Sequence, residues 1–163
     1  MRVLDVGAGP LTSIGTHCGS TRLEVVPTDL LAPSYDATLD TLGLTPRTRT
    51  RFCPVEQLSK CFAPAWFDLA TSFNALDHAQ DPLTGMKEML HVLRPRCSVV
   101  LVQKINESNK QRGSGMHQYN FFVNDDEFFV QRRNRGSVSI NGALQQVATG
   151  VKSNVHRRTD PLK

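Results

Sequence analysis

The sequence has little of what marks membrane, secreted or metal-binding proteins. No apolar run approaches the roughly 20 residues needed to cross a bilayer, and no charged stretch followed by an apolar stretch and a cleavage site opens the chain. The four cysteines, Cys18, Cys53, Cys61 and Cys97, lack CxxC or metal-ligand spacing. We therefore expect buried free thiols, no disulfide framework, no metal site, no membrane contact and a cytoplasmic location.

Aromatic residues are also sparse, at 7%, and they are absent from the most basic stretch, "QRRNRG" at 131–136. The net charge of +4 is concentrated in the last third, where nine Lys or Arg face four Asp or Glu from Ser108 onward. Basic patches that bind nucleic acid usually carry aromatic side chains on which bases stack. A solvated hairpin turn is therefore the favoured interpretation, and nucleic acid is an unlikely partner.

The chain of 163 residues is long enough for one domain with a real core. Residues 1–144 carry the patterned segments and form the predicted domain. Residues 145–163 show little apolar periodicity, and we expect a loosely ordered basic tail there.

Strand and helix patterns alternate along the first two thirds of the chain. Predicted strands cover 2–6, 22–29, 47–54, 65–74 and 98–105, and predicted helices cover 10–18, 32–43 and 81–93. This alternation predicts an α/β fold with a mostly parallel sheet, covered on both faces and with 98–105 as a central strand. The stretch 126–141 predicts an antiparallel hairpin, turning at 134–136 and added to that sheet.

The opening "MRVLDVGAGPLTS" places an acid, Asp5, just before Gly7 and Gly9 at the end of the first strand. Asp29 ends the second strand, at the distance typical of an acid that binds ribose hydroxyls. A dinucleotide would place its pyrophosphate near Asp5, at a cost on the order of 4 kcal/mol for charges ~4 Å apart. S-adenosylmethionine carries an ammonium and a sulfonium instead. The turn also has Thr12 where the dinucleotide pattern has its third glycine.

Four stretches together resemble the class I S-adenosylmethionine-dependent methyltransferases that modify small molecules. They are "VLDVGAGP", "PTDLLAPSYD", "FDLATSFNALDHAQDP" and "EMLHVLRP", and the resemblance covers residues 2–105. It implies a Rossmann-like fold, a seven-stranded sheet with a C-terminal antiparallel hairpin, and S-adenosylmethionine as the cofactor. It also implies methyl transfer to a metabolite or sugar-like acceptor.

The resemblance further implies a set of cofactor-binding residues that runs from the methionine end to the adenine: Asp5, Gly7, Gly9, Asp29, Leu30, Val55, Glu56, Phe73 and Asn74. Structural alternatives stay open for three of them. Asp29 could cap the next helix, Glu56 could cap or solvate a helix start, and Phe73 could belong to the core.

Methyl transfer is an in-line displacement on an activated sulfonium, so positioning supplies most of the catalysis. A base is needed only if the acceptor loses a proton. His78 and His117 are the candidates, with Asp77 and Tyr119 as candidate substrate contacts in "ALDHAQ" and "GMHQYNF". A structural hydrogen-bonding role for each histidine is the alternative.

Several positions depart from the family pattern. Leu11 stands in the turn where a third glycine is common, Pro54 replaces an acid before the adenine segment, and Arg96 follows Pro95 where glycine is usual. The first predicted strand begins at residue 2, so we expect this chain to lack the N-terminal helices that often cover the substrate pocket in this family. An inactive or truncated cofactor-binding module that needs a partner is therefore the second hypothesis. The sequence leaves the oligomeric state open.

Overall fold

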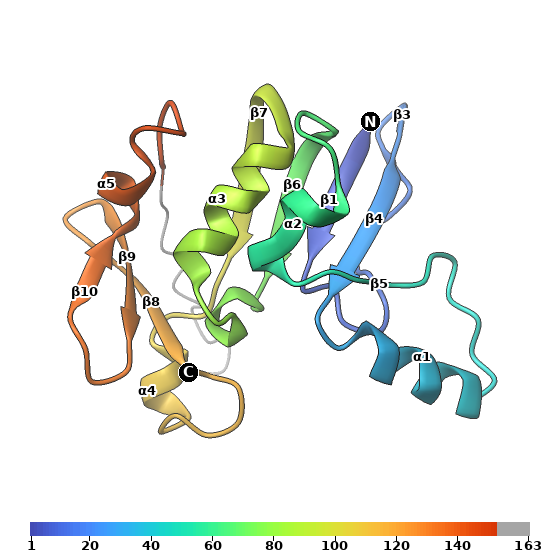
Figure 1. Cartoon of the computed structure of the whole chain (residues 1–163), viewed down its shortest axis with the longest axis horizontal. Coiled ribbons are helices and arrows are strands. Elements are labelled where there is room, and N and C mark those ends of the chain that lie inside the picture. Colours follow the sequence, from blue (N-terminus) through green and yellow to red (C-terminus); the bar gives the residue numbers. More distant parts are fainter. Residues whose placement is uncertain (153–163) are drawn as a thin grey trace, which may run out of the picture.

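The computed structural model describes residues 1–152, and the rest of the predicted tail, 153–163, lies outside the described residues (Figure 1). The elements in chain order are β1 (Arg2–Val6), β2 (His17–Cys18), β3 (Thr21–Arg22), β4 (Glu24–Asp29), α1 (Ala32–Thr41), β5 (Arg51–Phe52), η1 (Val55–Gln57), α2 (Leu58–Cys61), β6 (Phe67–Phe73), η2 (Leu76–His78), α3 (Pro82–Val92), β7 (Leu93–Val102), α4 (Glu107–Lys110), β8 (Tyr119–Asn124), β9 (Glu127–Arg132), β10 (Ser137–Ser139) and α5 (Ile140–Leu144). No helix among residues 1–152 is both long and apolar enough to cross a bilayer.

Five parallel strands form the main sheet in the order β5-β4-β1-β6-β7. Strand β1 lies at its centre because its "VLDV" run is buried along its length, as expected for a strand covered on both faces. Val3 pairs with Val25 of β4 and Leu69 of β6. The parallel order brings the carboxyl ends of β1, β4 and β6 to one edge of the sheet, where ligands bind in such folds.

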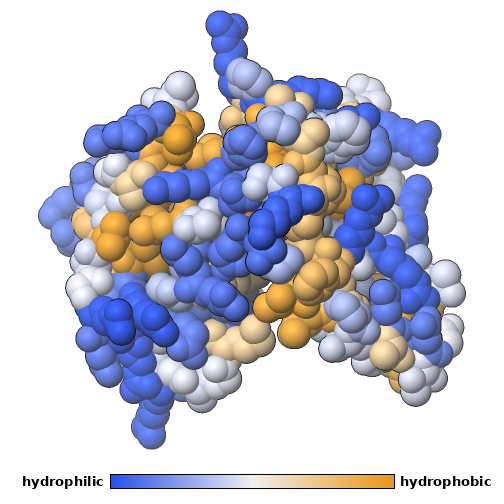
Figure 2. Space-filling view, viewed as in Figure 1, coloured by the Kyte–Doolittle hydropathy of each residue, from blue (hydrophilic) through white to orange (hydrophobic). Residues whose placement is uncertain are grey.

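Helix α3 begins where the sequence predicts. The Asp81 side chain accepts hydrogen bonds from the backbone amides of Leu83 and Thr84, and Pro82 occupies the first turn. Met86 and Met89 are fully buried on the inner face of the helix. Helices α2 and α3 lie across one face of the sheet (Figure 1), and the outer surface on this side is mostly hydrophilic with apolar patches between (Figure 2).

The predicted hairpin is confirmed by β9 and β10, which pair antiparallel across the turn at 133–136. Strand β8 also joins β9, so these strands form a separate three-stranded sheet. A single bridge between Ile105 and Phe121 connects it to the chain leaving β7. The α/β class is confirmed, but among residues 1–152 the parallel sheet has five strands instead of seven, and β7 is an edge strand of it where a central one was expected.

Two further expectations are wrong. Residues 10–18 form no helix, because the Thr12 hydroxyl bonds Asp5 and accepts the amide of Ile14, which competes with helical backbone bonding. The end of this stretch, His17–Cys18, forms the short strand β2, which pairs with β3. The sheet is also not covered evenly on both faces, since Val100 and Val102 of β7 are exposed.

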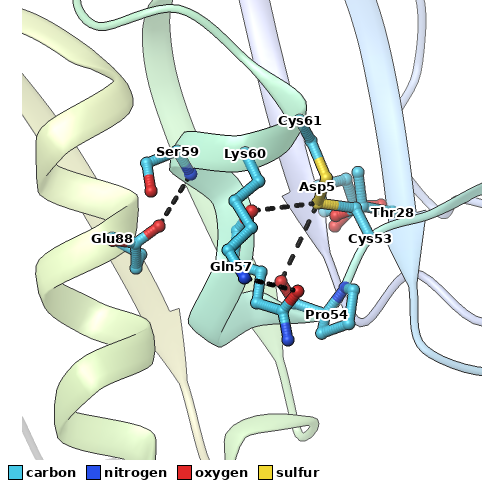
Figure 3. The surroundings of a disulfide bond; sticks show 9 residues. All are labelled: Asp5, Thr28, Cys53, Pro54, Gln57, Ser59, Lys60, Cys61 and Glu88. Atoms are coloured by element: carbon cyan, nitrogen blue, oxygen red, sulfur yellow. Dashed lines mark hydrogen bonds between the residues drawn. A yellow bond between two sulfur atoms is a disulfide. The ribbon is translucent and has the colours of Figure 1, made fainter.

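The cysteine expectation is also wrong. Cys53 and Cys61, with Cα atoms 6.5 Å apart, form a disulfide that closes the segment containing η1 and α2 (Figure 3). Of the two free cysteines, Cys18 is exposed and Cys97 is half-buried. The pairing arises because η1 and α2 fold the intervening residues back toward the end of β5, which no spacing rule for cysteines reveals.

Candidate functional site

The turn after β1 is shaped by two glycines with left-handed backbone, Gly7 and Gly9, both at φ +68°. The amides of Gly7 and Ala8 both donate to the carbonyl of Thr28, at 2.8 and 3.1 Å, which fastens the turn to the end of β4. A Cβ on Gly7 would lie 2.2 Å from Cβ of Ala75. A Cβ on Gly9 would meet nothing within 4 Å, so the turn is closely packed at Gly7 and open at Gly9.

Asp29 holds this turn from the end of β4. Its Oδ2 accepts the amide of Gly9 at 3.0 Å, and its Oδ1 accepts the amide of Leu31 at 2.8 Å. The second bond ends at Leu31, the N-cap residue of α1, and this helix has no side-chain cap hydrogen bond, so the alternative capping role is not seen. Each carboxylate oxygen can accept more than one hydrogen bond, so Asp29, which is half-buried, retains acceptor capacity for ribose hydroxyls. Leu30 beside it is exposed.

Asp5 is enclosed under the turn, with only 2% of its surface exposed. Its carboxylate accepts the hydroxyls of Thr12 at 2.6 Å and Thr71 at 3.3 Å. Burial raises the pKa of Asp5, and these two hydrogen bonds oppose the rise. Within residues 1–152, Asp5 forms no ion pair with a basic side chain. A cation near the turn would therefore be favoured by this carboxylate.

The segment expected to touch adenine is tied to α3. Oε1 of Glu56 accepts the amides of Gln80 and Asp81, at 2.8 and 3.1 Å. Val55 packs against Gly85, where an added Cβ would come within 2.9 Å of the valine. Both side chains thus secure η1 to the start of α3, and the disulfide holds the same segment from its other side (Figure 3).

The end of β6 presents one exposed and one anchored residue. Phe73 is 41% exposed, so its ring is available as a wall for a ligand. Asn74 has a φ of +50°, and its side-chain Oδ1 accepts the backbone amide of Lys104 at 2.9 Å. The backbone amide of Asn74 donates to the carbonyl of Val102. Asn74 therefore fixes the ends of β6 and β7 relative to one another.

Asp77, His78 and His117 meet in one cluster although His117 lies 40 residues beyond Asp77. Nδ1 of His117 lies 2.6 Å from Oδ2 of Asp77 and 3.1 Å from Nε2 of His78. Asp77 is buried, whereas the histidine side chains are 33% and 29% exposed. The donor atoms of these three residues all lie within 4.8 Å of one another, and the expectation of no metal site stays a prediction.

The Tyr119 side chain bonds a residue outside that cluster. Its hydroxyl donates to the carbonyl of Gln80 at 2.7 Å, and its ring lines a groove of about 260 Å³ between the start of α3 and the hairpin. Arg132 and Arg135 line the same groove. Arg133 points elsewhere and donates to the carbonyl of Arg112. The basic hairpin therefore does not present its arginines as one surface.

Sequence reasoning missed the residues that support the expected site. Thr12 and Thr71 bond Asp5, and the Thr50 hydroxyl donates to the carbonyl of Gly9 at 2.7 Å. Threonines in strands and turns are common and carry no spacing signal. The Asp77–His117 contact was missed as a pair because it depends on where β8 lies relative to η2.

The parallel sheet and its glycine turn define a Rossmann-like α/β protein with a ligand site at the carboxyl edge. Residues 4–101 match the family model described as a methyltransferase domain. That match covers more than half of the chain, so the chain belongs to the methyltransferase domain family. S-adenosylmethionine is the cofactor of this class.

Two solved structures with TM-scores of 0.50 or more agree with the fold. The trans-methyltransferase CalH, solved in complex with SAH, gives a TM-score of 0.52 at 15% identity and covers 71% of this chain and 35% of its own. Phosphoethanolamine N-methyltransferase 2 of Haemonchus contortus gives 0.50 at 21% identity, covering 76% and 30%. YcgJ of Bacillus subtilis gives 0.45 at 18% identity, covering 78% and 65%. The chain thus spans less than two thirds of each of these proteins. No curated protein matches it.

Proposed function

We propose that the chain transfers a methyl group from S-adenosylmethionine to a small-molecule acceptor. The observation that carries this proposal is the glycine turn, which donates the Gly9 amide to Asp29 and leaves open space at Gly9. The ribose would bind Asp29, and the methionine part would lie along Gly7 and Gly9 toward Phe73. Bound there, the cofactor supplies the activated methyl group.

Whether the residues of the glycine turn fit this cofactor depends most on Asp5. A buried carboxylate without a cationic partner among the described residues costs free energy, and a nearby ammonium or sulfonium reduces that cost. A pyrophosphate at the same turn would increase it. The fit is therefore to S-adenosylmethionine and not to a dinucleotide.

In this proposal the adenine is recognised by apolar contacts more than by hydrogen bonds to acidic side chains. Oε1 of Glu56 is held by two backbone amides, which leaves Oε2 as its remaining acceptor, and Pro54 offers no side-chain hydrogen bond. The exposed side chain of Leu30 is the available apolar contact beside Asp29. A modest affinity for the adenine part follows, with most of the specificity at the ribose and methionine ends.

Proton removal from an acceptor, where the chemistry needs it, falls to the histidine cluster. Asp77 orients His117 through the 2.6 Å contact, the arrangement of a base with its positioning carboxylate. Asp77 and His78 lie in η2, and η2 follows Ala75, which packs on Gly7. A base in this position would lie near the methionine end of the site.

A small acceptor is favoured over nucleic acid because the hairpin arginines are divided between a groove and an internal contact. The direct experiment incubates the chain with S-adenosylmethionine labelled on the methyl group and with separate pools of metabolites, RNA and protein. Label in the metabolite pool supports the proposal. Label confined to RNA or protein contradicts the acceptor class.

A second candidate is a cofactor-binding module that requires a partner chain. The exposed Val100 and Val102 on the uncovered face of β7 favour it, because apolar side chains on a sheet face are usually covered. Cofactor binding without label transfer to any pool would support this candidate over the first.

A further inference from the structure

We propose that Asp77, His78 and His117 bind a divalent transition-metal ion of the zinc type. The ion binding itself does not depend on the proposed methyl transfer. Its donors would be Oδ2 of Asp77, Nε2 of His78 and Nδ1 of His117, which come from η2 and from the segment just before β8.

The separations of the three donor atoms suit one ion. They are 2.6 Å between His117 and Asp77, 3.1 Å between the two histidines and 3.5 Å between His78 and Asp77. Bonds of about 2.0–2.2 Å to an ion place neighbouring donors roughly 3.0–3.5 Å apart. Two separations lie in that range already, and the third needs to open by roughly half an ångström.

Hydrogen bonding within the cluster makes one atom, Nδ1 of His117, serve two partners. Nδ1 of His117 carries either one hydrogen or one lone pair, yet it faces both Asp77 and His78. If Nδ1 of His117 donates its hydrogen to Asp77, Nε2 of His78 faces an N–H group that is already hydrogen-bonded. If it accepts from His78, its lone pair lies 2.6 Å from the Asp77 carboxylate. A cation accepts electron pairs from all three donors at once.

The surrounding contacts hold the donors in place. The amide of Gln118 donates to the carbonyl of Asp77 at 3.0 Å, which joins η2 directly to the segment carrying His117. The Tyr119 hydroxyl adds a second link through Gln80. Asp77 is 4% exposed, while the outer parts of both histidines reach solvent, so an ion has a route to the cluster.

The donor set indicates which ion would bind. Two imidazole nitrogens and one carboxylate oxygen suit Zn²⁺, Co²⁺, Ni²⁺ or Fe²⁺, whereas Mg²⁺ and Ca²⁺ prefer oxygen donors. Three protein ligands leave a position open for water or for an acceptor group. With the ion bound the histidines act as ligands in place of bases, and a hydroxyl or thiol on the open position would lose its proton more readily, a consequence that rests on the proposed function.

The test is calorimetric titration of the full chain, freed of metal by chelator, with ZnCl₂ and separately with MgCl₂. Cys18→Ser and Cys97→Ser form the background, because free thiols also bind zinc. We expect one Zn²⁺ per chain and no response to Mg²⁺. His117→Gln, His78→Gln and Asp77→Asn should each weaken Zn²⁺ binding about tenfold or more.

His91→Gln is the matched control, because His91 is an exposed histidine on α3 outside the cluster. It should bind Zn²⁺ like the background protein. Circular dichroism identifies any variant that fails to fold, and the remaining two then carry the test. Absence of Zn²⁺ binding in the folded background, or equal weakening by His91→Gln, would overturn the proposal. Binding of S-adenosylmethionine, measured on the same samples, reports separately on the proposed function.

Discussion

The backbone amide of Gly9 lies 3.0 Å from Oδ2 of Asp29, so the acid at the end of β4 holds the turn at the end of β1. Asp29→Ala should therefore weaken S-adenosylmethionine binding about tenfold or more and also lower the free energy of unfolding by about 1–3 kcal/mol, because two backbone amides lose their acceptor. Titration calorimetry and urea unfolding measure the two effects.

Asp29→Asn separates the effect on cofactor binding from the effect on stability, because the side-chain oxygen of asparagine still accepts a hydrogen bond while the negative charge is lost. Glu127→Ala, which removes an exposed acid of the hairpin, is the control and should alter neither quantity. Unchanged cofactor affinity in Asp29→Ala would contradict the role given to this residue.

The two glycines of the turn should respond differently to alanine. Gly7→Ala places a Cβ 2.2 Å from that of Ala75 on left-handed backbone, so it should cost about 2–4 kcal/mol of stability. Gly9→Ala meets no neighbour and should cost only about 1–2 kcal/mol, from the backbone conformation. Chemical denaturation measures both. Ala75→Gly should restore part of the loss in Gly7→Ala but none of that in Gly9→Ala, and equal rescue of both would count against this packing.

Asp5 should make stability depend on pH. Its pKa is raised in the folded state by burial, so the folded protein binds the proton more tightly than the unfolded chain. This contribution is fully present below the unfolded pKa near 3.8 and is lost as the pH rises through the folded value. Asp5→Asn, which cannot ionise, should therefore gain stability relative to the natural chain as the pH rises from about 4 to 7. Thermal unfolding of the two proteins at several pH values measures this; a constant difference would exclude the effect.

The disulfide gives a chemical prediction. Two of the four cysteines should react with a thiol reagent in denaturant before reduction, and all four afterwards. Replacing Cys53 and Cys61 together by alanine should lower the unfolding free energy by about 2–3 kcal/mol, because a short loop is no longer closed in the unfolded chain. Cys18→Ser should leave stability nearly unchanged. Four reactive thiols before reduction would show that the bond is absent.

Much of the fold could be predicted from local patterns. The run "RVLDV" is apolar enough to specify β1, and Asp81 with Pro82 specifies the start of α3. The segment 10–18 was misjudged because the Thr12 side chain bonds Asp5, a contact between residues seven positions apart that a helix pattern does not contain. The place of β7 at a sheet edge depends on where β8 pairs, which local pattern cannot specify.

The candidate site was predictable where adjacent parallel strands bring residues together and not where packing between other elements does. Gly7, Gly9 and Asp29 meet because β1 and β4 are adjacent parallel strands. Glu56 was expected near adenine, but its bonds to the amides before α3 depend on packing between η1 and α3. The histidine cluster likewise requires two segments about 40 residues apart to meet.

The proposal that this chain binds S-adenosylmethionine is tested most directly by calorimetric titration of the purified chain with S-adenosylmethionine, with NAD as the comparison. We expect binding of S-adenosylmethionine at one site per chain, binding weaker by about tenfold or more in Asp29→Ala, and no response to NAD. A folded chain that binds NAD, or that gives no response to S-adenosylmethionine, would contradict it.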